Sequence, residues 1–184
     1  MKLNQRSTKT DNKSIPNKIQ IREEAIKGLS EVRVLDLFAG RNTLWNNIRT
    51  DRYFGIDLQK DKGNNLSADT RDVLTQLEFL AYNVIDCDSY GIPFDILKYL
   101  FQNKLLSKGT IVIYTAITNE FTKIQNVAKR ELNFAEFYDK APSLFNANAI
   151  EFFYEFLAMN DVKEVNYYEI RDHFKKHYGY FKIS

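Results

Sequence analysis

The chain has 184 residues, of which 44% are hydrophobic and 27% charged, and its net charge is +2. These values are typical of one globular domain, and no apolar run approaches the roughly 20 residues that cross a bilayer. The single cysteine, Cys87, excludes an intrachain disulfide, and with only two histidines it argues against a structural zinc site. The N-terminal residues lack the apolar stretch of a secretory signal. We therefore expect no metal, no membrane span and a cytoplasmic location.

The N-terminal segment differs in composition from the rest of the chain. Residues 1–20 carry five lysine and arginine residues against Asp11 alone, and residues 1–18 are almost free of apolar side chains. We predict a flexible basic arm over residues 1–18 and a single domain over residues 19–184. Such an arm favours contacts with a phosphate backbone, and a soluble leader without a partner is the alternative.

From residue 19 onward, helical and strand-like segments alternate. Apolar spacing predicts helices over residues 19–29, 43–49, 70–80, 94–105, 119–132 and 143–158. Short apolar or β-branched runs predict strands at 32–38, 53–57, 66–68, 83–88, 110–115, 162–170 and 178–183. Strands that alternate with helices imply right-handed crossovers, so the chain is predicted to be an α/β protein, doubly wound around a mostly parallel sheet.

Acidic residues follow several of these strands. Asp36, Asp57, Asp69 and the segment 86–91 all lie at predicted carboxyl ends, where open parallel sheets bind their ligands. Asp57 comes 21 positions after Asp36, a spacing at which a carboxylate holds a ribose diol. Gly40 permits a sharp turn, but the three glycines of the nicotinamide fingerprint are missing, which disfavours an oxidoreductase.

The first of these strand ends carries a family resemblance. Residues 34–42, Val-Leu-Asp-Leu-Phe-Ala-Gly-Arg-Asn, resemble the first motif of class I S-adenosylmethionine-dependent methyltransferases. Residues 55–57, Gly-Ile-Asp, resemble the second motif, and Asp69 resembles the acid that contacts the adenine amino group. The resemblance implies a Rossmann-like fold with a seven-stranded sheet, an antiparallel C-terminal strand, and S-adenosyl-L-methionine as cofactor. The cofactor-binding residues that it implies are Asp36, Phe38, Ala39, Gly40, Asn42, Asp57, Leu58, Asp69 and Asp86.

The segment after the strand at 83–88 is the most distinctive. Residues 83–93 resemble the fourth motif of methyltransferases that modify amino groups of nucleobases, most closely that of the tRNA guanine-N2 dimethyltransferases. The match covers about residues 32–118, without the RNA-binding extra domain of that family. It implies that Asp88 accepts hydrogen bonds from the substrate amine and that Tyr90 stacks on the base. Ser89 stands where the family has proline, and Asn42 where it usually has glycine. A β-turn with a helix cap is the alternative for residues 88–91.

Together these patterns predict an S-adenosylmethionine-dependent methyltransferase that acts on an exocyclic amine of a nucleobase in RNA or DNA. A catalytically lapsed nucleotide- or nucleic-acid-binding module on the same fold is one alternative, and a small-molecule or protein methyltransferase is another. The short chain leaves room for a dimer or a partner subunit in substrate recognition. The many aromatic residues of the C-terminal third, such as Phe152, Phe153 and Phe156, are predicted to form a second core layer, with a base-stacking surface as the alternative.

Overall fold

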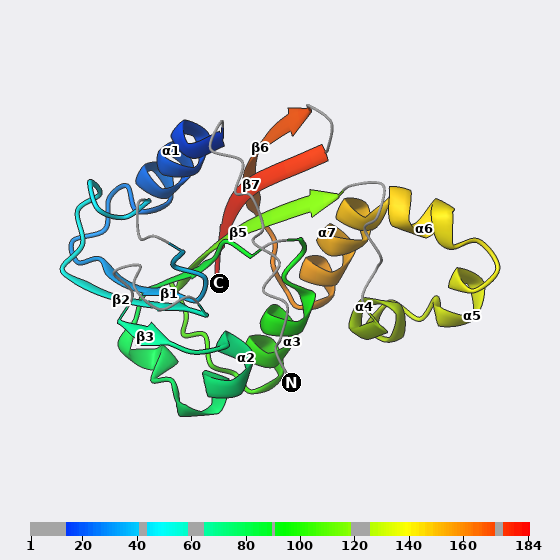
Figure 1. Ribbon diagram of the computed structural model, residues 1–184, viewed down its shortest axis with the longest axis horizontal. Helices are drawn as coiled ribbons and strands as arrows, with labels where there is room; N and C mark the ends of the chain where they lie inside the picture. The colour runs from blue at the N-terminus through cyan, green and yellow to red at the C-terminus, as the bar shows by residue number, and fades with distance from the viewer. Residues whose placement is uncertain (1–13, 41–43, 59–64, 90, 119–125, 172–174) are drawn as a thin grey trace, which may run out of the picture.

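The strands form one seven-stranded sheet in the order β3-β2-β1-β4-β5-β7-β6 (Figure 1). The computed structural model describes residues 14–40, 44–58, 65–89, 91–118, 126–171 and 175–184. The strands are β1 (Arg33–Asp36), β2 (Arg52–Asp57), β3 (Leu66–Ser67), β4 (Val84–Cys87), β5 (Ile111–Thr118), β6 (Val165–Arg171) and β7 (Lys175–Lys182). Strands β1 to β5 pair in parallel, whereas β7 runs antiparallel between β5 and β6. The predicted α/β sheet with an antiparallel C-terminal strand is therefore confirmed.

The helices depart from the predicted ones at several points. They are α1 (Ile15–Ala25), α2 (Thr70–Val73), α3 (Phe94–Gln102), α4 (Asn126–Glu131), α5 (Ala135–Tyr138), α6 (Pro142–Ala147) and α7 (Ala149–Met159), with 3₁₀ turns at Leu74–Gln76 and Phe79–Ala81. The helix predicted over residues 43–49 is wrong, because residues 44–47 form turns that carry Trp45 into the core. The predicted helix over 70–80 is broken, since the buried residues Leu74 and Phe79 are five positions apart and cannot share one face of an α-helix.

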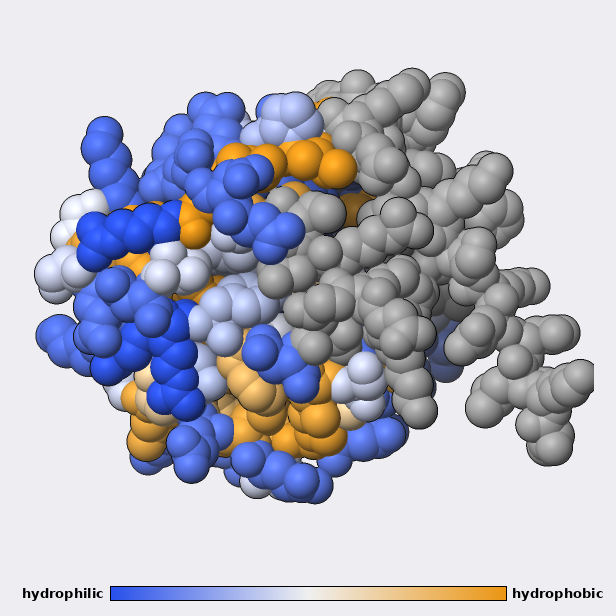
Figure 2. Space-filling view, turned by 60° about the vertical axis from the view of Figure 1, so that its left-hand side comes forward, coloured by the Kyte–Doolittle hydropathy of each residue, from blue (hydrophilic) through white to orange (hydrophobic). Residues whose placement is uncertain are grey.

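The first helix begins earlier than the boundary that composition predicts. Residues 15–18, assigned to the arm, lie in α1, and residues 1–13 are outside the described part of the chain. In the described residues, no helix is long and apolar enough to span a bilayer. Figure 2 shows a surface on which hydrophilic residues predominate and apolar side chains gather in limited areas.

Alternate residues of the strands face two different helical layers. Val34, Val84 and Ile113 belong to the core under α1, whereas their neighbours Leu35 and Ile85 face the layer that contains α3 and α7. This alternation follows from the two-residue period of a strand, and burial on both sides explains why the strands are continuous apolar runs. Whether a residue stands at an odd or an even position along its strand (its parity) therefore decides which helical layer its side chain faces.

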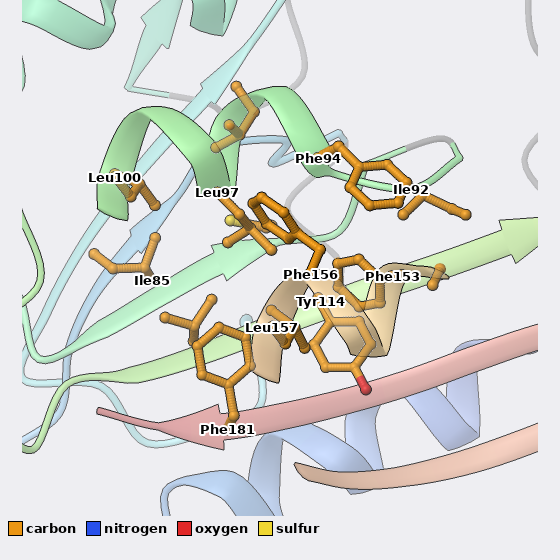
Figure 3. Packing of buried hydrophobic residues seen from close by; sticks show 14 of the residues in the cluster. Ile85, Ile92, Phe94, Leu97, Leu100, Tyr114, Phe153, Phe156, Leu157 and Phe181 are labelled. Carbon is orange, nitrogen blue, oxygen red and sulfur yellow. The ribbon is translucent and has the colours of Figure 1, made fainter. Parts of the chain in front are cut away.

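The core between the sheet and helices α3 and α7 is rich in aromatic rings (Figure 3). Phe94 of α3 meets Phe153 and Phe156 of α7 edge-on, with ring centroids 5.6 and 5.5 Å apart. Tyr114 of β5 lies 5.0 Å from Phe153, and Phe181 of β7 is fully buried. The prediction that these C-terminal aromatics form a second core layer is confirmed for Phe153 and Phe156.

Candidate active site

Three carboxylates converge on the α1 side of the sheet, at the carboxyl ends of the central strands. Asp36 closes β1 and is in register with Asp86 of β4; their side chains are 3% and 0% exposed. Asp88 lies two positions further along and keeps the same parity. Cys87, between the two acids, points into the opposite core. The strand period thus gathers Asp36, Asp86 and Asp88 and separates them from the thiol.

Arg22 of α1 reaches into this acidic group and is itself buried. Its Nε donates to Asp86 Oδ2 over 2.8 Å, its Nη2 to Asp88 Oδ2 over 3.2 Å, and its Nη1 to the backbone oxygen of Lys18 over 2.7 Å. Burial alone would lower the pKa of Arg22. The negative charges of Asp86, Asp88 and Asp36 outweigh this effect, so the pKa lies above its usual value. Arg22 therefore stays charged and compensates acids that would be costly to bury alone.

Asp88 is the most completely bound of the three acids. Lys18 Nζ lies 2.7 Å from its Oδ1 and 2.8 Å from its Oδ2, and the Thr115 hydroxyl donates to Oδ1. Burial favours the neutral acid, yet the positive charges of Lys18 and Arg22 outweigh it and lower the pKa of Asp88. Asp88 is therefore an ionised carboxylate with both oxygens in hydrogen bonds.

The pKa values of Asp36 and Asp86 are raised, in contrast to that of Asp88. Burial raises the pKa of Asp86 despite Arg22 and despite the Trp45 Nε1 hydrogen bond at 2.7 Å. Burial and the nearby Asp86 raise the pKa of Asp36 well above its usual range. Asp36 accepts from the Phe38 amide and the Tyr53 hydroxyl, each at 3.1 Å. One proton is thus favoured on this pair of neighbouring acids, as expected where like charges share a buried site.

Two buried polar atoms at the end of β4 lack a hydrogen-bond partner in the described structure. They are Asp86 Oδ1 and Ser89 Oγ. Buried oxygens are normally paired, so unpaired ones at a strand end indicate a place for a ligand or for water. They are an acceptor and a hydroxyl within the segment that the sequence singles out.

The glycine turn after β1 is fastened to β2. The Gly40 amide donates to Asp57 Oδ2 over 2.9 Å, and the Ala39 amide donates to the Ile56 backbone over 2.8 Å. Gly40 has a φ of +54°, which favours glycine. A Cβ on Gly55 would lie only 2.8 Å from Ala39 Cβ, so glycine at 55 lets the turn pack on β2. Asp57 therefore lies beside the Gly40 turn.

The other predicted cofactor residues are more dispersed. Leu58 follows Asp57 with 67% of its surface exposed, and Phe38 packs at the margin of the core. Asp69 is the N-cap of α2 and accepts from the Arg71 amide over 2.9 Å. Asn42 and Tyr90 lie outside the described residues. The structure thus brings together Asp36, Asp86 and Asp88, with Asp57 at the turn that follows β1 and Ser89 next to Asp88 in the chain.

Sequence reasoning missed the residues that bind these acids. Lys18 was assigned to the arm, Arg22 and Trp45 were given no role, and Thr115 was noted only as a strand end. A signal was present: Lys18, Arg22 and Ala25 are four and three positions apart, so the two basic residues share a helix face with a buried alanine. Basic residues inside an apolar stripe indicate buried acids opposite.

Within the ranges that the structure describes, no group of three or more histidine, cysteine, aspartate or glutamate side chains is arranged to hold a metal ion. His173 is outside those ranges, and His177 of β7 instead contacts Tyr154 and Glu169. At the acidic group, Arg22 and Lys18 supply the positive charge.

The strand order, with β7 antiparallel between β5 and β6, defines the fold as Rossmann-like and of the methyltransferase type. No protein-family model matches the sequence, and no curated protein matches it. Among solved structures, the chain is similar to wild-type Trm5b from Pyrococcus abyssi, with a TM-score of 0.48 and 13% sequence identity. That match covers 91% of this chain and 49% of the Trm5b chain, so this chain spans about half the length of that protein.

Proposed function

We propose that this protein is an S-adenosylmethionine-dependent methyltransferase acting on an exocyclic amine of a nucleobase in RNA or DNA. The observation that carries the proposal is the convergence of carboxylates at the ends of neighbouring parallel strands: Asp57 on β2, Asp36 on β1, and Asp86 and Asp88 at β4. In open α/β sheets, ligands bind just beyond these ends.

The residues present suit this cofactor. S-adenosylmethionine carries an ammonium group, and the unpaired Asp86 Oδ1 is an acceptor that such a donor can meet. The turn at Gly40 brings backbone close to any ligand that Asp57 binds through a ribose, and the exposed Leu58 offers an apolar contact for adenine. When bound, the cofactor supplies a methyl group that is already activated for transfer.

The role of Asp88 follows from its charge and its support. An aromatic amine is a poor nucleophile because its lone pair is delocalised into the ring. An ionised carboxylate that accepts its N–H bonds orients the amine and localises that lone pair. Thr115 and Arg22 fix Asp88 for this purpose, so orientation is the main contribution of the protein. After transfer, the nitrogen bears a positive charge and readily gives its proton to Asp88 and then to water.

A lapsed binding module is the second candidate, and one observation favours it. Both oxygens of Asp88 are bound by Lys18 in this structure, so a substrate amine meets an occupied acceptor. Such a protein would retain the nucleotide site and lack turnover.

The two candidates are separated by measuring binding and transfer on the same samples. We expect S-adenosylmethionine and S-adenosylhomocysteine to bind in calorimetry, and labelled methyl groups to pass from the former to total RNA or DNA. Asp88→Ala should abolish transfer and leave cofactor affinity within about twofold. Asp139→Ala, at an exposed position after α5, is the matched control and should change neither. Binding without transfer in the wild type would select the lapsed module, and no binding would refute both.

A further inference from the structure

The ammonium group of Lys18 is placed on Asp88 in the way that a substrate amine would be. Its nitrogen lies 2.7 Å from Oδ1 and 2.8 Å from Oδ2, so it bridges the two oxygens. The exocyclic amino group of a nucleobase also has a single nitrogen that carries more than one N–H donor. The ammonium and the amino group therefore compete for one position on the carboxylate.

We propose that Lys18 is the internal occupant of the amine position on Asp88, and that the nucleobase amine must displace it. This inference rests on the proposed function. It makes the contact between α1 and the acids part of substrate binding rather than packing alone.

The contacts of Asp88 show that Lys18 can leave without disturbing the carboxylate. Once Lys18 is withdrawn, Oδ1 keeps its bond from Thr115 and Oδ2 its bond from Arg22. Asp88 then keeps a donor on each oxygen, and the side that Lys18 covered is open to a new donor. Arg22 is 1% exposed and is held by three hydrogen bonds, so it is the fixed partner.

Lys18 itself is the less constrained of the two cations. Its side chain is 16% exposed, and it lies near the start of α1, one turn after Ile15. Ser14, which precedes the helix, makes no side-chain capping bond, so the amides of the first turn have no partner from that residue. Of the two cations on Asp88, Lys18 is therefore the one with partial access to solvent.

Lys18 is suited to occupy the site and unsuited to react there. An ammonium nitrogen has no lone pair with which to attack a methyl group, and the Asp88 carboxylate that binds it has a lowered pKa. A neutral nucleobase amine retains the lone pair that transfer requires. The occupant is therefore chemically inert, while a competing amine at the same position is reactive.

The first test compares Lys18→Met, which removes the charge and keeps the length of the side chain, with Lys27→Met at an exposed position beyond α1. Labelled methyl transfer is measured to adenosine, guanosine and cytidine, with uridine, which lacks an exocyclic amine, as the blank. We expect transfer to the amine-bearing nucleosides to rise about tenfold in Lys18→Met, as when a competing contact of ordinary strength is lost. Lys27→Met should match the wild type.

The second test uses the wild-type chain, so it does not depend on the folding of a variant. Acetylation of Lys18 by a succinimidyl acetate is followed by mass spectrometry with S-adenosylhomocysteine bound, and Lys27 is the internal reference. Cytidine should accelerate labelling of Lys18, and uridine should not.

The outcomes distinguish this inference from the proposed function. Unchanged or lower transfer in a folded Lys18→Met that still binds the cofactor would overturn the inference alone, and so would Lys18 labelling that ignores cytidine. A wild-type chain that binds no S-adenosylmethionine would remove the proposed function, and the inference with it.

Discussion

The guanidinium of Arg22 lies 2.8 Å from the carboxylate of Asp86, and neither side chain is more than 1% exposed. One partner belongs to the first helix and the other to the central strand β4, so the pair fastens α1 across the carboxyl edge of the sheet. A buried pair of this kind is not a large net gain in stability, but it is costly to break from one side.

We expect Arg22→Met to lower the free energy of unfolding by about 3–5 kcal/mol, because Asp86 loses its buried counter-charge. Urea denaturation followed by circular dichroism measures the change. The control is Arg49→Met, whose side chain is 64% exposed beside Asp51 and should cost less than about 1 kcal/mol. Equal, small losses in both variants would show that the buried pair is dispensable.

Asp36→Asn should make stability less dependent on pH. The raised pKa of Asp36, caused by burial and by Asp86, means that the folded chain retains a proton that the unfolded chain releases above about pH 4. Stability of the wild type therefore falls as pH rises toward the folded pKa, whereas the asparagine variant lacks this loss. The amide oxygen can still accept from the Phe38 amide, and the amide NH2 can donate to the Tyr53 hydroxyl oxygen in place of the bond that Asp36 now receives.

Thermal melting from pH 4.5 to pH 8.5 checks this sign. The melting temperature of Asp36→Asn should exceed that of the wild type by a margin that grows with pH to a few degrees. A margin that shrinks as pH rises would mean that Asp36 is ionised in the folded protein.

Asp57→Ala should weaken binding of S-adenosylmethionine by about 1–3 kcal/mol, because the ribose hydroxyls lose their hydrogen bonds to the carboxylate. Two effects add, because the variant removes the predicted ribose contact and also releases the Gly40 amide that Asp57 holds. Calorimetric titration measures it. Equal affinity in wild type and variant would refute the ribose assignment.

Gly179→Ala should destabilise the sheet by about 1–3 kcal/mol through overpacking. A Cβ there would lie 2.6 Å from the Asn166 backbone oxygen and would also overlap the ring of Tyr114, which crosses Gly179 on the neighbouring strand. Chemical denaturation measures the loss. When it is combined with Tyr114→Leu, which removes the ring, the total loss of stability should be smaller than the sum of the two single losses. A fully additive double variant would exclude the Tyr114 overlap as the cause.

The strand ends were predictable because an apolar run that stops at an acid is a local signal. Asp36, Asp57 and Asp86 were found in this way, and the parallel order of the strands brings them to one edge. The ion pairs were not predictable by the same reasoning, since Arg22 and Asp86 are 64 positions apart and the pairing exists only once α1 packs on the sheet. Trp45 was misassigned to a helix for a related reason, because its bond to Asp86 and its burial override the local pattern.

The two faces of the sheet have a consequence for how this protein can change over evolutionary time. The acids and their cations lie beneath α1, whereas the aromatic rings of Phe94, Phe153 and Phe156 lie beneath α3 and α7. Substitutions that repack the aromatic layer would alter the thermal stability of the protein and leave the charged edge unchanged. Selection for thermal stability could then act in the aromatic layer without changing the positions that would bind a new acceptor molecule.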